Sequence, residues 1–166
     1  MVGASRNLLL SGLVAMTAVG FITVPIAGAL ADRIGRRKVF ISGCVLVAVF
    51  TFVYFVLLDT KVPALVFLAM ALSFIPIMYG AEAALIAESF TPRLRYSGSS
   101  IGYQFASIIA GGPAPFIATW LFSTFHSAIP IGIYAVVCAV ISICSALLLP
   151  DQTNKDIAHE VNYGNA

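Results

Sequence analysis

The sequence predicts an all-α membrane protein with five transmembrane helices. Of its 166 residues, 60% are hydrophobic and only 10% are charged, whereas a soluble domain usually carries about 25% charged residues. A helix needs about 20 apolar residues to cross a bilayer. Five apolar runs have about this length, and they cover residues 8–30, 39–58, 62–87, 100–122 and 129–149. We therefore expect a helical membrane unit over residues 1–149, followed by a polar tail over residues 150–166.

The loops between these runs alternate in charge. The first and third loops are basic, the second is neutral, and the fourth has neither Lys nor Arg. Cytoplasmic loops are enriched in Lys and Arg, so the first and third loops should face the cytoplasm. The N-terminus would then lie outside and the tail would be a flexible cytoplasmic end. An outside N-terminus without an export signal suggests a fragment of a longer membrane protein, or a product that begins at an internal Met.

Composition and spacing argue against several functions. The net charge is only +2, and the cations gather at helix ends instead of along one face, so we expect no nucleic-acid partner. No pair of residues has the spacing of a nucleophile and its base, and no loop resembles a phosphate cradle, so we expect no enzyme. Cys44, Cys138 and Cys144 fall inside apolar runs and are interpreted as packing residues. His126 and His159 lie far from them in the sequence, so no metal and no cofactor are expected.

Prolines and glycines interrupt three of the apolar runs. Pro25 lies in the first run, Pro76 in the third, and Gly111, Gly112 and Pro113 in the fourth. An interior proline frees a carbonyl that must find a partner or line a wet cavity, and transporters place such broken helices at their binding sites. The alternative is a plain kink or a close-packing site. We favour a functional bend for the cluster that begins at Gly111.

A few polar side chains within the apolar runs are candidates for a substrate cavity. Glu82 lies well inside the third run, where a carboxylate usually marks a pathway, a pair or a proton relay. Tyr79 lies three residues earlier on the same helix face. Tyr103 and Gln104 lie about one turn into the fourth run. The alternatives are a passive carboxylate near the cytoplasmic mouth for Glu82 and interhelical hydrogen bonding for Tyr103 and Gln104.

The two basic loops also contain carboxylates, which orientation alone does not require. We interpret the loops as a cytoplasmic gate whose opposite charges interlock and separate through charge-assisted pairs. The alternative is orientation signalling alone, with surface pairs worth about 0–1 kcal/mol. The candidate gate residues are Asp32, Arg33, Arg36, Arg37, Glu88, Arg93 and Arg95.

Two segments carry a family resemblance. Residues 28–38 (GALADRIGRRK) resemble the cytoplasmic loop signature of the major facilitator superfamily. Residues 79–98 (YGAEAALIAESFTPRLRYSG) are similar to the tenth-helix region of its metabolite:proton symporter branch, and residues 102–104 (GYQ) and 111–115 (GGPAP) to the eleventh helix. The branch includes carriers of proline and betaine, 2-oxoglutarate, citrate and shikimate.

The resemblance implies that the five runs are helices eight to twelve of a twelve-helix carrier. Asp32 would then be the loop carboxylate that meets a helix end in the other six-helix bundle, and Glu88 with Arg93 and Arg95 would be the second cytoplasmic charge site. The implied function is proton-coupled symport of a small organic acid or zwitterion by alternating access. The implied partners are that substrate, a proton, the lipid bilayer and the missing N-terminal helices, in a cell membrane such as the bacterial inner membrane. The alternative is a truncated helix bundle that does not transport and acts only as a packing or oligomeric subunit.

Overall fold

In the computed structural model, residues 6–60, 62–71 and 75–149 are described, and they form helices joined by turns without a strand. The predicted tail at residues 150–166 lies outside the described residues. Five helical stretches are long and apolar enough to cross a membrane, so the predicted fold class of five transmembrane helices is confirmed. The helices are α1 (Arg6–Ile34), α2 (Arg36–Asp59), α3 (Pro63–Ala71), α4 (Ile75–Glu88), α5 (Arg95–Ala106), the π-helix η1 (Ser107–Gly111), α6 (Ala114–Phe125) and α7 (Ile129–Leu148).

The fourth span, Arg95–Phe125, is assembled from α5, η1 and α6. The third span, Pro63–Glu88, contains α3 and α4, and the residues between these two lie outside the described ones. The other three spans are single helices. Helix α1 continues through Pro25, and Pro76 lies in α4, where it is buried.

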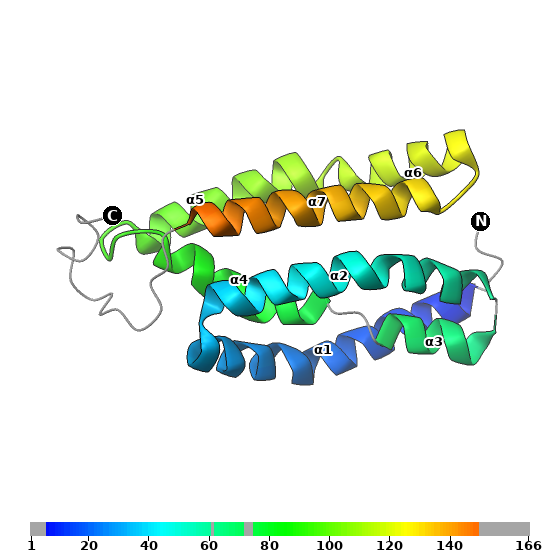
Figure 1. Cartoon of the computed structure of the whole chain (residues 1–166), viewed down its shortest axis with the longest axis horizontal. Coiled ribbons are helices and arrows are strands. Elements are labelled where there is room, and N and C mark those ends of the chain that lie inside the picture. Colours follow the sequence, from blue (N-terminus) through cyan, green and yellow to red (C-terminus); the bar gives the residue numbers. More distant parts are fainter. Residues whose placement is uncertain (1–5, 61, 72–74, 150–166) are drawn as a thin grey trace.

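Successive turns lie at opposite ends of the bundle (Figure 1). The α1–α2 turn, the α4–α5 turn and the end of α7 lie together at one end, on the left of the view. The start of α1, the α2–α3 turn and the α6–α7 turn lie at the other end. The two basic loops are therefore neighbours in space.

Helix α2 is the centre of the packed part of the molecule, because it contacts α1, α3, α4 and α7. Its connection to α1 is a single residue, Gly35, with a backbone φ of 110°. Only glycine adopts this conformation without steric cost. The Gly35 N–H donates to the carbonyl of Ala31 at 2.9 Å. The chain thus reverses within one residue, and Arg36 and Arg37 follow directly beside the end of α1.

Helices α1 and α4 approach each other at two glycines. A Cβ atom built at Gly80 would lie 2.6 Å from the carbonyl oxygen of Val24 and 2.9 Å from the backbone nitrogen of Gly28. Small residues at such crossings allow membrane helices to pack backbone against backbone. Towards the basic loops, Ala31, Val39 and Ala81 form a buried cluster that joins α1, α2 and α4.

The fourth span packs much less closely than the others. Helices α5, η1 and α6 contain no buried residue. Beyond its contacts with η1, α5 contacts α4 and α6 contacts α7. In the part of the chain that the structure describes, this span therefore touches only two neighbouring helices.

Candidate functional site

The guanidinium of Arg36 joins two carboxylates at the end of the bundle where the basic loops meet. Its Nε and Nη2 atoms donate to Asp32 Oδ1 at 3.1 and 2.8 Å. Its Nη1 atom forms an ion pair with Glu88 Oε1, at the end of α4. The Glu88 side chain is only 14% exposed, whereas that of Asp32 is 61% exposed. Arg36 thus connects the ends of α1 and α4 through the start of α2.

The other candidate gate residues are distributed around this bridge. Arg37 donates to backbone carbonyls at the end of α7. Arg33 is exposed at the end of α1, and Arg93 is exposed in the α4–α5 turn. Arg95 is half-buried at the start of α5. The structure therefore brings carboxylates of both basic loops onto Arg36, which sequence spacing alone does not single out.

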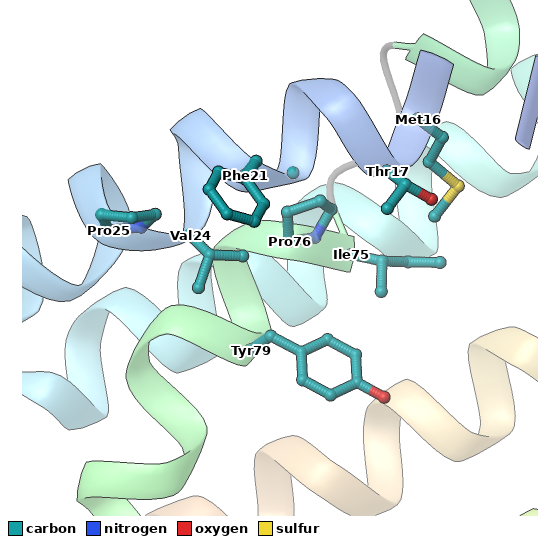
Figure 2. A pocket seen from close by; sticks show the side chains of 9 residues that line it. Met16, Thr17, Phe21, Val24, Pro25, Ile75, Pro76 and Tyr79 are labelled. Carbon is teal, nitrogen blue, oxygen red and sulfur yellow. The ribbon is translucent and has the colours of Figure 1, made fainter. Parts of the chain in front are cut away.

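Tyr79 lies in an apolar cavity of about 490 Å³ between α1 and α4. Pro25 and Pro76 line the same cavity, together with Phe21, and Figure 2 shows these side chains on α1 and α4. The Thr17 hydroxyl at its edge donates to the carbonyl of Leu13 at 2.9 Å. The Tyr79 hydroxyl can both donate to and accept from a ligand in this cavity, whereas the Thr17 hydroxyl, whose proton is used, can only accept.

Tyr103 and Gln104 lie together in a second, more polar cavity of about 260 Å³ between α4 and α5. Ser99 and Ser100 on α5 and two apolar residues of α4 complete its lining. Hydroxyl and amide groups can donate and accept hydrogen bonds without carrying charge. The structure therefore brings Tyr103 and Gln104 together, but it places Tyr79 in a different cavity along the same helix α4.

Glu82 lies between these two cavities on α4 and is half-buried. The fully buried Cys44 of α2 lies near it. Among the described helices of the five spans, Glu82 is the only Asp, Glu, Lys or Arg that lies more than about one turn from a helix end. A carboxylate at such a position in a membrane helix usually marks a pathway, a pair or a proton relay.

The interruption of the fourth span begins earlier than the sequence indicates. The π-helix covers Ser107–Gly111, and the Gly112 N–H donates to the Ser107 carbonyl at 3.0 Å. Pro113 precedes α6 with α-helical backbone angles. π-Turns inside helices occur frequently at functional sites. Gly111, Gly112 and Pro113 therefore form the end of a widened turn that starts at Ser107.

Some of these features have no clear signal in the sequence. Phe21 and Val24 line the cavity beside Tyr79, but an apolar residue facing a cavity looks like one facing lipid. The carbonyls that accept from Arg37 belong to the backbone and leave no mark in the sequence. Gly28 and Gly80 have a signal in the sequence, because small residues within apolar runs allow membrane helices to pack closely. Within the described residues, no group of three or more His, Cys, Asp or Glu side chains could hold a metal ion.

Comparison with known proteins decides the family. The sequence model of the Major Facilitator Superfamily matches residues 2–160. The chain belongs to the Major Facilitator Superfamily. It is 37% identical over 159 residues to the inner membrane metabolite transport protein YhjE of Escherichia coli, covering 93% of this chain and 36% of that protein. It is 33% identical over 156 residues to the shikimate transporter of the same organism, covering 90% of this chain and 35% of the relative.

A citrate-proton symporter of Klebsiella pneumoniae is also similar, at 37% identity over 134 residues, which cover 73% of this chain and 28% of the relative. The resemblance to metabolite:proton symporters is thereby confirmed. Because these relatives are transporters, the expectation that the chain is not an enzyme is confirmed as well. No solved structure matches the chain. The chain spans about a third of the length of these relatives.

Proposed function

We propose that this chain forms part of a proton-coupled symporter that moves a small organic acid or zwitterion by alternating access. The observation that carries the proposal is the similarity of 93% of the chain to a metabolite transport protein. The citrate-proton symporter among the relatives supports proton coupling. The relatives are named for different substrates, so the proposed substrate class is broad.

The positions of the polar groups on α4 support this function. Tyr79 lines the apolar cavity, and Glu82 follows one turn later. Tyr103 and Gln104 lie across from α4 in the polar cavity. In this proposal Glu82 takes up and releases the coupled proton, while Tyr79, Tyr103 and Gln104 form hydrogen bonds with the substrate.

The Arg36 bridge supports a role for the basic loops in closing one end of the pathway. Asp32 remains largely exposed while it pairs with Arg36, so its carboxylate is available to a second bundle. We propose that Asp32, with the exposed cations Arg33 and Arg93, meets that bundle when the pathway is closed at this end. The pairs separate when the end opens. Arg36, which is itself paired with Glu88, holds the Asp32 side chain in position.

The proposed location is the bacterial inner membrane, with the basic loops in the cytoplasm. Both basic loops lie at one end of the bundle, beside the end of α7, and basic loops stay preferentially on the cytoplasmic side. The C-terminus would then be cytoplasmic. Labelling of single cysteines with an impermeant reagent in intact cells and in inverted vesicles tests this orientation.

The function is tested by uptake of radiolabelled shikimate, citrate, proline and betaine into membrane vesicles, with and without an inward proton gradient. Two proteins are compared: the 166-residue chain, and a chimera in which the N-terminal helices of the shikimate transporter precede it. We expect gradient-driven uptake by the chimera. Uptake by the chain itself would indicate that several copies assemble a pathway, and it would contradict the alternative of a bundle that does not transport.

Glu82→Gln tests the proton site in the same chimera. This variant keeps the shape of the side chain and removes its charge. We expect it to lose accumulation driven by the gradient and to retain exchange of labelled for unlabelled substrate. Tyr79→Phe tests the substrate site and should raise KM for the substrate. Its control is Tyr96→Phe, at an exposed position at the start of α5, which should leave KM unchanged. Gradient-driven accumulation by Glu82→Gln at the unsubstituted level would contradict the proposed role.

A further inference from the structure

The first turn of α2 carries adjacent positive charges that nothing within that turn neutralises. It begins Arg36-Arg37-Lys38 and contains no acidic residue. The N-terminal end of a helix is the positive end of its macrodipole, so each cation there is unfavourable. The positive charge of Arg36 is balanced by the carboxylates of Asp32 and Glu88. The positive charge of Arg37 needs another partner.

The charge of Arg37 is balanced by backbone carbonyls at the end of α7. Its Nη2 atom donates to the carbonyl of Leu147 at 2.5 Å, and its Nη1 atom donates to the carbonyl of Leu149 at 3.3 Å. Helix α7 has no basic residue in its own last turn, and the last four carbonyls of a helix lack partners within the helix. Leu149 adopts an extended backbone, as a residue before proline prefers. The start of α2 thus supplies the cation that the end of α7 lacks.

The same two helices also meet at the opposite end of the bundle. A Cβ atom built at Gly132, near the start of α7, would lie 3.1 Å from Phe52 Cε1 and 3.6 Å from Thr51 Cγ2 on α2. Helices α2 and α7 are therefore antiparallel neighbours that are joined close to both ends. At one end the two helices pack closely, and at the other the guanidinium of Arg37 donates to carbonyls at the end of α7.

We propose that Arg37 is a positioning residue that locks the end of α7 onto the start of α2. Together with Arg36, it ties the ends of α1, α2, α4 and α7 into one unit, while α5 is left out of the lock. A planar guanidinium can reach two carbonyls at once, whereas the ammonium of lysine is a point charge without a fork. The lock goes beyond the proposed transport function and needs no substrate.

The test measures distances between nitroxide labels on the 166-residue chain in liposomes. One label pair is Ile34→Cys and Leu148→Cys, at the end of the bundle near Arg37. The other pair is Val14→Cys and Ile133→Cys, at the far end. All four positions are exposed. The exposed Cys138 and Cys144 are replaced by alanine, and the buried Cys44 is kept.

We expect Arg37→Gln to broaden the distance distribution between residues 34 and 148 by about twofold and to leave the pair at 14 and 133 unchanged. Arg37→Lys should broaden it less. Lys38→Gln, the matched control, removes the neighbouring exposed cation and should change neither pair. An unchanged 34–148 distribution in folded Arg37→Gln would overturn the proposal, as would equal broadening at both ends or in Lys38→Gln. If Arg37→Gln does not fold, a distribution in Arg37→Lys identical to that of the original chain overturns it. Because no substrate is added, this result is independent of the transport proposal.

Discussion

The group of helices α1, α2 and α4 and the span formed by α5, η1 and α6 both belong to stretches that are apolar enough to cross a membrane. The two regions differ in how they pack. The first group contains buried residues on every helix, among them Ala31, Val39 and Ala81. The second contains none, and its side chains include Ile108, which is 69% exposed. An apolar sequence makes a helix stable in lipid, but close packing needs small residues or charge pairs that face a neighbour. The difference shows that hydropathy identifies membrane helices without identifying which of them form the rigid part.

The largest effect should come from filling the closest contact of the packed group. Gly80→Ala places a methyl group against the backbone of α1, which has no side chain to move aside. We expect a loss of about 2 kcal/mol in the free energy of unfolding, measured by titration of the purified chain with a denaturing detergent. Gly102→Ala is the matched control on α5, because a Cβ atom there meets nothing within 4 Å. Equal losses in the two variants would contradict the difference between the two regions.

Arg36→Gln should have the next largest effect, because it leaves the poorly exposed Glu88 without its ion pair. We expect a loss of about 1.5 kcal/mol in unfolding free energy. The Lys38→Gln variant removes a cation from the same turn and should lose less than about 0.5 kcal/mol. A double-mutant cycle with Glu88→Gln measures the coupling directly. Additive effects of the two substitutions would show that the pair does not contribute to stability.

Labelling of single cysteines tests how exposed the fourth span is. A cysteine at Ile108 should react with a lipid-soluble maleimide at least about tenfold faster than a cysteine at the buried Val66 of α3, because a packed side chain reacts only when the structure opens locally. The background carries alanine at Cys138 and Cys144. Slow labelling of Ile108→Cys would mean that another copy or another protein covers this span.

The smallest effect concerns two adjacent glycines at the end of the π-helix. A Cβ atom at Gly112 would lie 2.9 Å from the carbonyl oxygen of Ile108, whereas one at Gly111 meets nothing within 4 Å. We expect Gly112→Ala to cost about 1 kcal/mol of unfolding free energy and Gly111→Ala to cost less. The same detergent titration measures both. A larger loss for Gly111→Ala would place the strained position of the turn elsewhere.

Much of the fold could be predicted from the sequence, because the hydrophobic length of a membrane helix and the charge of its loops are local properties. The five spans and the proximity of the two basic loops follow from them. The choice of Arg36 among the basic residues as the partner of Glu88 could not be predicted, since it depends on the one-residue turn at Gly35 and on the packing of α4 against α1. The acceptors of Arg37 are backbone carbonyls, which any residue type could supply.

The candidate site is predicted in part for the same reason. Tyr103 and Gln104, both predicted as cavity residues, line the same cavity beside α4. The position of Tyr79 in a different cavity, beside Phe21 and Pro25, depends on how two helices cross, which spacing along one chain does not determine. The roles assigned to Tyr79, Glu82, Tyr103 and Gln104 stay predictions.

The π-helix in the fourth span also affects how residues on it should be counted. A π-turn holds about one residue more than an α-turn, and each residue of an α-helix turns the chain by about 100°. A helical wheel drawn with a single period from Arg95 to Phe125 therefore assigns the residues of α6 to the wrong side. Deletion of one residue within Ser107–Gly111 would rotate all of α6 against α7, so the length of this segment determines which residues of α6 face its neighbour.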